Sequence, residues 1–520
     1  MSETGVHGAQ LILLLLLLFV TTFAALARKI QTPYPIVLVV AGLLLGFVPG
    51  IPKITLDPDL IFLVVLPPLL YSAAWVTSWR DFSHNLVSIA MLALGLVGFT
   101  VLAVAELGPW LFSGFDWRIG FVLGACVAAT DAIAATSIAN RVGLPKVIVD
   151  LLEGESLIND ATGLLALEFA TAMVVEGRHP TVGAGLLRLV YLSVAGLATG
   201  LLLGRIVEWV EHRIEDGPIE IGVSILVPYA AYLTAEAIHA SGVLAVVAAG
   251  LYLGRKSSEF LSSGVRLQTR AVWSSLEFIL NGFVFVLIGL QLPSVLAGVR
   301  ELSLKQVILY GAAFSVLLIL LRLLWTFPGA YVAHFIRRRF LHQNESWPTA
   351  RAVFVVGWTG MRGVLALAAA MSLPQTIANG SLFPHRDLIV FLTFSVILVT
   401  LVFQGLTLPP LIRLLGLART SDPNEEDRHG RGLVLEAALA ELNELRRTDS
   451  AGNAELYDDL AQHYKHRLAS ISAASEEYDT NAGERYFQYL ELSRALLDVE
   501  RRTALRLRDR GEIVDAVLRD

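Results

Sequence analysis

Residues 154–160 read Gly-Glu-Ser-Leu-Ile-Asn-Asp and place two carboxylates inside an otherwise apolar stretch. Glu155 and Asn159 lie four residues apart and share one face of a helix, whereas Ser156 and Asp160 share the adjacent face. Charged side chains are costly within a bilayer and usually mark a functional site there. The stretch therefore predicts a membrane-spanning helix whose two polar faces suit an alkali cation. A helix-capping turn is the alternative interpretation, because Asn and Asp favour helix breaks.

The apolar character extends over most of the chain. Hydrophobic residues make up 55% of the 520 residues, charged residues make up 17%, and the mean hydropathy is +0.63. Soluble proteins average about 45–50% and about 25%, so this composition indicates a membrane protein. Apolar runs recur near the roughly 20 residues that a helix needs to cross a bilayer. We therefore predict an all-α polytopic membrane protein with about 13 transmembrane helices, at 9–27, 34–49, 57–76, 84–108, 118–141, 148–175, 183–207, 219–238, 241–255, 272–296, 306–334, 351–373 and 387–415.

Positive charge is distributed unevenly among the loops between these spans. If the N-terminus lies outside, the inner loops hold fifteen Lys or Arg residues and the outer loops hold seven. Because Lys and Arg favour the cytoplasmic side of a membrane, this bias supports an outside N-terminus and a cytoplasmic C-terminal tail.

The first apolar run, Leu11 to Ala27, could also be interpreted as a cleaved signal peptide, because it ends in Ala-Leu-Ala. A signal peptide begins with a positively charged region. Here the first ten residues contain Glu3 and no Lys or Arg, and the positive pair Arg28 and Lys29 follows the run. We therefore expect a retained first helix.

The last fifth of the chain is polar and acidic. Residues 1–419 carry 26 Lys or Arg and 24 Asp or Glu, whereas residues 420–520 carry 14 and 22. We expect a transmembrane domain over 1–418, a linker over 419–432 and a cytosolic helical tail over 433–520, where apolar residues recur at helical spacing. The tail is either a regulatory or dimer-stabilising module or a helical hairpin without a regulatory role. No basic surplus suggests nucleic-acid binding.

A further acid lies in the middle of another predicted span. Asp131 is surrounded by small residues in the sequence Ala-Ala-Thr-Asp-Ala-Ile-Ala-Ala-Thr, residues 128–136. Small residues let helices approach closely and allow a helix to unwind where it lines a cavity. An isolated aspartate there must face water, a cation or a partner. We interpret the remaining acids in the spans as structural: Glu106, Glu168, Glu236 and Glu277.

A glycine-rich interruption occurs near the end of the membrane domain. Residues 357–363 read Gly-Trp-Thr-Gly-Met-Arg-Gly and suggest a broken helix. Interrupted spans in the two halves of a transporter are a good indication of its binding site, and the span around the isolated aspartate is the other member of such a pair. A buried arginine needs an acidic partner. We expect Arg362 to form a structural ion pair with Glu155, with Arg322 as the competing arginine.

Together these motifs resemble the sodium/proton exchanger family in its bacterial NhaP-like branch. The matching residues are Ala129-Thr130-Asp131, the Gly-Glu-Ser and Asn159-Asp160 of the next span, the late Gly-x-Arg-Gly, and Leu-Pro-Pro-Leu-Leu-Tyr at 66–71. The resemblance covers about residues 10–415. It implies a homodimer in which a core domain moves against a dimerisation domain. It also implies inverted repeats with two broken helices that cross near the midplane.

The resemblance also assigns roles to individual residues. It makes Asp160 the principal carrier of cation and proton. Asp131, the carbonyl of Thr130, and Ser156 would complete the shell around Na⁺. Asn159, in place of a second aspartate, is the pattern associated with electroneutral exchange.

Ser72 departs from the family pattern, because family members often carry an acid at that position. We include it among the residues that line the site, and K⁺ or Li⁺ is the alternative cation. The implied function is antiport of a monovalent cation and protons across the bacterial cell membrane, with no enzymatic activity and no cofactor. The single Cys126 excludes disulfides and thiolate metal sites within the chain.

Three other functional classes are the alternatives: a passive cation channel, an intramembrane aspartyl protease that uses Asp131 and Asp160, and a transporter of organic anions. The sequence contains no ring of repeated ligands of the kind that a channel needs. It also lacks the two similar catalytic loops expected of the protease.

Overall fold

The computed structural model describes residues 3–49, 57–177, 182–343, 347–378, 380–418, 425–448, 454–472 and 480–514. The chain divides into two units, Met1–Ala418 and Arg419–Asp520. Throughout the described ranges the regular structure is helical, apart from one isolated bridge between Thr376 and Leu382. The all-α fold is therefore confirmed.

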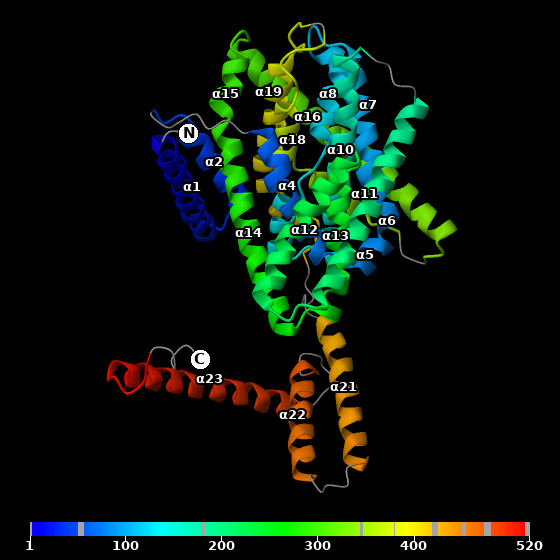
Figure 1. Cartoon of the computed structure of the whole chain (residues 1–520). Helices are drawn as coiled ribbons and strands as arrows, with labels where there is room; N and C mark the ends of the chain where they lie inside the picture. Colours follow the sequence, from blue (N-terminus) through cyan, green and yellow to red (C-terminus); the bar gives the residue numbers. More distant parts are fainter. Residues whose placement is uncertain are drawn as a thin grey trace. The chain divides into compact units, whose positions relative to one another are not determined.

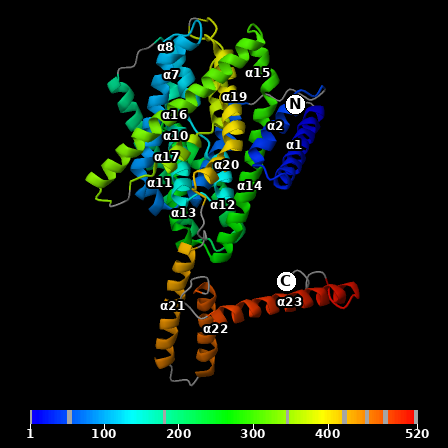
Figure 2. The same cartoon turned by 180° about the vertical axis from the view of Figure 1, so that it is seen from behind.

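Helical segments occupy all thirteen ranges predicted as membrane spans (Figures 1 and 2). Three short π-helical turns, η1 to η3, continue the α-helices on either side of them. In chain order the segments are α1 (Glu3–Lys29), α2 (Tyr34–Gly46), α3 (Pro58–Leu60), η1 (Ile61–Val65), α4 (Leu66–Val76), α5 (Trp79–His84), α6 (Leu86–Ala90), η2 (Met91–Leu96), α7 (Val97–Leu111), α8 (Trp117–Ala128), α9 (Ala132–Val142), α10 (Lys146–Val175), α11 (Val182–Glu211), α12 (Gly217–Ala237), α13 (Gly242–Phe260), α14 (Ser263–Leu290), α15 (Leu292–Gly298), α16 (Leu304–Phe340), α17 (Ala350–Trp358), α18 (Val364–Met371), α19 (Arg386–Val399), η3 (Thr400–Gln404) and α20 (Gly405–Leu414).

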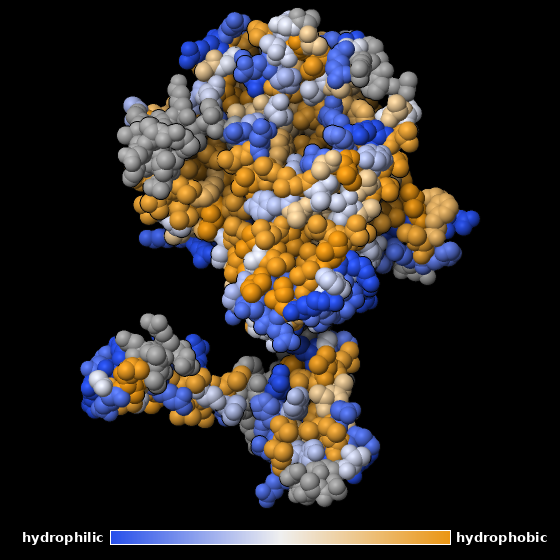
Figure 3. Space-filling view, viewed as in Figure 1, coloured by the Kyte–Doolittle hydropathy of each residue, from blue (hydrophilic) through white to orange (hydrophobic). Residues whose placement is uncertain are grey.

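Within the described residues, nine segments are long and apolar enough to cross a membrane. The four predicted spans that are not among the nine are α1, α2, which has only 13 residues, α13, and the interrupted segment formed by α17 and α18. The count of thirteen crossings therefore remains a prediction. Figure 3 shows hydrophobic residues over the middle of the membrane unit and hydrophilic residues toward its ends, as expected for a surface that contacts lipid.

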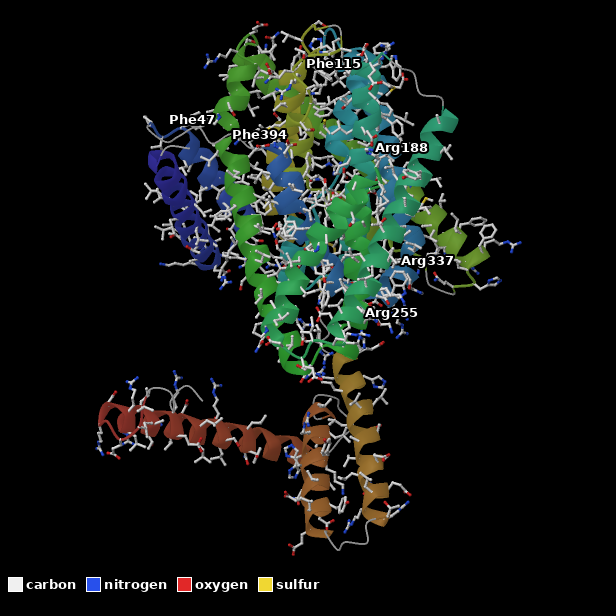
Figure 4. The ribbon with its side chains drawn as sticks, viewed as in Figure 1. Phe47, Phe115, Arg188, Arg255, Arg337 and Phe394 are labelled. Carbon is white, nitrogen blue, oxygen red and sulfur yellow. The ribbon has the colours of Figure 1, made fainter. Side chains whose placement is uncertain are left out.

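The two ends of the membrane unit carry loops that the sequence assigns to opposite sides of the membrane. Phe115, in a loop predicted to lie outside, is near one end, whereas Arg255 and Arg337, in loops predicted to lie inside, are toward the other (Figure 4). These three positions therefore lie where the predicted order of loops puts them, and the orientation in the membrane remains a prediction.

The helix α14 is held in place by close packing against α2. A Cβ atom at Gly42 would lie 2.5 Å from the carbonyl oxygen of Val286, and a Cβ atom at Gly289 would lie 2.3 Å from that of Val39. Because both positions are glycine, the two backbones can touch directly. This contact fixes the helix that forms one wall of the cavity described below.

The segment that contains α8 and α9 is the most buried of the nine candidate spans, with 72% of its apolar window inside the unit. A helix can be interrupted at membrane depth only where protein, or a cavity, surrounds the freed backbone groups. The burial of this segment meets that condition.

The second unit consists of α21 (Glu425–Thr448), α22 (Ala454–Ser472) and α23 (Thr480–Asp509). An ion pair joins α21 to α22, with Arg446 Nη1 2.8 Å from Asp458 Oδ1. The helix α21 already begins at Glu425, so the part of the predicted linker from 425 to 432 is helical. The role of this tail remains a prediction.

Candidate functional site

Two interrupted helical segments meet inside the membrane unit. The helices α8 and α9 are separated by residues 129–131, and α17 and α18 are separated by residues 359–363. The backbone N–H of Asp131 donates to the carbonyl of Met361 across 2.9 Å. A Cβ atom at Gly363 would lie 2.3 Å from Asp131 Oδ2, so only glycine allows this approach. The two interruptions, both predicted from the sequence, are therefore in direct contact.

Arg362 satisfies backbone carbonyls that these interruptions leave free. Its Nε donates to the carbonyl of Val127 at 2.6 Å, and its Nη1 donates to that of Gly360 at 2.9 Å. Its own backbone N–H donates to Thr400 Oγ1 at 3.1 Å. A buried cation at the carboxyl end of α8 is also favourable for the helix dipole. Arg362 thus acts as a structural clamp on the broken helix α8.

The predicted ion pair between Arg362 and Glu155 is wrong, because Glu155 pairs with the competing arginine, Arg322. Arg322 on α16 binds Glu155 on α10 through both terminal guanidinium nitrogens, Nη1 and Nη2, with Nη2 2.8 Å from Oε2. The exposed fractions of the two side chains are only 2% and 1%. Gly360 makes room for this pair, since a Cβ atom there would lie 2.1 Å from Arg322 Cδ.

The polar faces of α10 converge on Thr130, at the interruption between α8 and α9. Thr130 Oγ1 donates to Glu155 Oε1 at 3.0 Å and accepts from Asn159 Nδ2 at 2.5 Å. Ser156 Oγ donates to the carbonyl of Thr130 at 2.9 Å and accepts from the N–H of Ala132 at 3.3 Å. Both helix faces predicted from the spacing therefore contact the same break.

The two aspartates line one cavity of about 400 Å³. Asp131 accepts from the N–H of Ile133 at 2.8 Å and so caps α9. Asp160 is 8% exposed, and none of the residues that the structure describes donates a hydrogen bond to its carboxylate. Thr130 and Ser156 line the same cavity, whereas Asn159 is buried behind it. The structure thus brings together all four predicted Na⁺ ligands, and leaves Asn159, the fifth predicted site residue, outside the cavity lining.

The cavity has an acidic lining. Its carboxylates are Asp131, Glu153, Asp160 and Glu277, and the lining includes no Lys, Arg or His. Burying uncompensated negative charge is very unfavourable, so this cavity requires protons or cations. No three His, Cys, Asp or Glu side chains of the described chain lie close enough to hold one metal ion together. The oxygens that line the cavity, from carboxylates, hydroxyls and an amide, are ligands of the kind that hard cations prefer.

Ser72 lies behind the cavity wall instead of lining it. Its hydroxyl donates to Glu277 Oε1 of α14, and it is Glu277 that lines the cavity. The interpretation of Glu277 as structural therefore missed its place in the site. Ser274, Glu277 and Asn281 all line the cavity. Their spacing of three and four residues makes a polar stripe on one helix face, which was the signal in the sequence.

Comparisons with known proteins agree with this geometry. The profile of the family described as "Sodium/hydrogen exchanger, transmembrane" matches residues 14–414. This chain belongs to the sodium/hydrogen exchanger family. An uncharacterised Na⁺/H⁺ exchanger of Mycobacterium tuberculosis is 31% identical over 100% of this chain and 95% of the relative. A sodium, potassium, lithium and rubidium/H⁺ antiporter of Bacillus pumilus is 33% identical over 87% and 68%.

A solved structure shares the fold of this exchanger-family member. The sodium proton antiporter MjNhaP1 from Methanocaldococcus jannaschii superimposes with a TM-score of 0.59 over 79% of this chain and 99% of the neighbour, at 21% identity. The resemblance to the NhaP-like branch, inferred from the motifs, is thereby confirmed at the level of the fold.

The ion pair can be tested by a double-mutant cycle. We expect Arg322→Ala to lower the stability of the purified protein by about 3–5 kcal/mol, because it leaves the Glu155 carboxylate buried without a partner. The double variant with Glu155→Ala should lose less than the sum of the two single losses. Thermal unfolding in detergent measures these losses.

The matched control is the same cycle with Arg362→Ala. Arg362 donates to carbonyls and not to Glu155, so its loss should add to that of Glu155→Ala. Additive losses in the Arg322 cycle, or strong coupling in the Arg362 cycle, would contradict the assignment.

Proposed function

We propose that this chain is a secondary active antiporter that exchanges a monovalent cation, with Na⁺ as the first candidate, for protons across the bacterial cell membrane. The observation that carries the proposal is Asp160, which is buried, lines the acidic cavity and receives no hydrogen bond from the described residues. A carboxylate in that environment must be neutralised by a proton or by a cation. The two ligands therefore compete for one group.

The site is accessible from one side of the membrane at a time. If it can switch sides only when Asp160 has been neutralised by a proton or a cation, this competition becomes obligatory exchange. In the proposed cycle, Asp131, Ser156 and the carbonyl of Thr130 complete the cation's ligand shell. Asn159 holds Thr130 in position and carries no charge, which leaves a single titrating group in the Asn159-Asp160 pair. The exchanged cation is a substrate, and the cycle needs no covalent step.

The structural charges stand apart from this cycle. Glu155, Arg322 and Arg362 do not line the cavity. In our proposal they keep the helices around the interruptions together while those helices move as one body. We further propose a homodimer in which this body moves against the remaining helices, with the N-terminus outside and the tail in the cytoplasm.

The identity of the cation is the least constrained part of the proposal. The Bacillus pumilus relative is named for sodium, potassium, lithium and rubidium, and Ser72 replaces the acid that the resemblance leads one to expect. K⁺ is therefore the second candidate. Exchange assays with each alkali cation in turn would establish the order of preference.

We expect Asp160→Asn to reduce exchange to the level of protein-free vesicles, because an uncharged amide neither takes up and releases a proton nor attracts a cation as a carboxylate does. Cation-driven proton flux in proteoliposomes measures this loss. Glu106→Gln is the matched control, since Glu106 is an exposed acid of α7 outside the cavity. Normal exchange by Asp160→Asn would remove the carrier role of this residue.

The exchange should be electroneutral, with one cation moved for each proton, because the Asn159-Asp160 pair has one titrating group. The measurement uses proteoliposomes with equal Na⁺ concentration and equal pH on both sides and a potential imposed by valinomycin and a K⁺ gradient. With Na⁺ as the transported cation, the external pH should stay constant. A pH change driven by the potential alone would contradict the stoichiometry.

Truncation after Thr420 should leave exchange measurable, because every residue of the proposed site precedes the tail. We expect the truncated protein to differ in its pH dependence or in its dimerisation, which exchange assays across pH and light scattering would measure. The tail has a net charge of −8, and its attraction to the basic residues Arg337 to Arg339 would be screened beyond about 8–10 Å at physiological salt. A truncated protein that inserts and dimerises normally but does not transport would show that the tail belongs to the transport machinery.

A further inference from the structure

One wall of the acidic cavity belongs to α14, a helix outside the two interrupted segments. Ser274, Glu277 and Asn281 line the cavity from this helix. They stand three and four residues apart and so follow one helix face. Glu277 and Asn281 lie in the mainly apolar second half of α14, where polar side chains are costly at membrane depth unless they serve a polar path.

The side-chain amide of Asn281 has no hydrogen-bond partner among the described residues. The residue is 5% exposed. A polar group enclosed in protein is unfavourable when it lacks a partner. An amide that lines a cavity and lacks a protein partner is therefore available to a ligand in that cavity, and its oxygen is a suitable ligand for an alkali cation.

Glu277, one helical turn before Asn281, supplies a carboxylate to the same part of the wall. The hydroxyl of Ser72 on α4 donates to one of its oxygens, Oε1. This bond orients the carboxylate and leaves Oε2 free. No lysine, arginine or histidine lines the cavity to neutralise it.

The position on α14 is separate from the one at Asp160. No group of three carboxylates among the described residues is close enough to bind a single ion. Glu277 and Asn281 come from α14, whereas Asp131 precedes α9 and Asp160 belongs to α10, so the two groups line the cavity from different helices. The cavity therefore offers two groups of oxygens: Asp160 and Asp131 with Ser156 and the carbonyl of Thr130, and Glu277 with the amide of Asn281.

We propose that Glu277 and Asn281 form a second binding position for a monovalent cation, from which the cation passes to Asp160. This inference rests on the proposed antiport function and adds a residue that sets affinity. A cation held in the cavity raises the local concentration at the carrier carboxylate, as negatively lined clefts do for cationic substrates. Glu277 should therefore affect the apparent KM for the cation and not the maximal rate.

The first test uses Glu277→Gln, whose side chain keeps the shape and the oxygen that Ser72 contacts. We expect the apparent KM for Na⁺ in proteoliposomes to rise about tenfold while the maximal rate stays within about twofold, the pattern of a lost ground-state interaction. Asn281→Ala should raise KM in the same direction by a smaller factor. Glu106→Gln, which removes an acid outside the cavity, should leave both parameters unchanged.

The second test measures binding without transport. Thermal unfolding of Asp160→Asn should still shift upward on adding NaCl, relative to the same concentration of choline chloride, because the position on α14 is intact. The double variant Asp160→Asn/Glu277→Gln should lose that shift. A ligand that binds only the folded state raises the unfolding temperature, and its stabilisation grows with the logarithm of its concentration relative to Kd.

The outcomes separate this inference from the function on which it rests. Absence of exchange by the unaltered protein with any alkali cation would overturn the antiport function. Exchange by the unaltered protein together with an unchanged KM for Glu277→Gln would overturn only the second position. Equal shifts for the single and double variants would do the same. A correctly inserted Glu277→Gln variant that shows no exchange at saturating Na⁺ would also overturn the second position, since that result would assign Glu277 to the transport step.

Discussion

A helix that stops inside a bilayer leaves backbone amides and carbonyls that water cannot reach, and the membrane unit is organised around this constraint. The two interruptions partly satisfy each other through the bond from Asp131 N–H to the carbonyl of Met361. The guanidinium of Arg362 binds the carbonyl of Val127 at the end of α8. Either interruption alone would leave unpaired polar groups in a low-dielectric interior, so the two depend on each other.

The same arrangement separates structural charges from working charges. Glu155 and Arg322 neutralise each other behind the cavity, and Thr130 connects their pair to Asn159, the neighbour of Asp160. The carboxylates that line the cavity have no cationic side chain beside them. Arg322 and Arg362 thus have structural roles, and the carboxylates that line the cavity are left to be neutralised by the transported ions.

The sequence predicted those features that depend on a local pattern. Long apolar runs gave the positions of the helices, and Asp131 and Asp160 were identified because an isolated acid is conspicuous in an apolar span. The pairing of Glu155 depends on which of two distant arginines lies beside α10, and spacing along the chain carries no such information. Glu277 was misinterpreted because it was considered singly, without Ser274 and Asn281 on the same face. The start of α21 at Glu425 was missed because the glycines at 430 and 432 suggested a linker, although an acidic first turn favours a helix N-terminus.

The burial of Cys126 has a practical consequence. This residue is the only cysteine in the sequence and is 1% exposed, and thiols enclosed in apolar surroundings are chemically inert. Thiol-specific reagents are therefore expected to leave the native Cys126 unlabelled. A cysteine introduced on the wall of the acidic cavity would be the reactive group, and membrane-impermeant reagents added to one side of the membrane would report which face the cavity opens to.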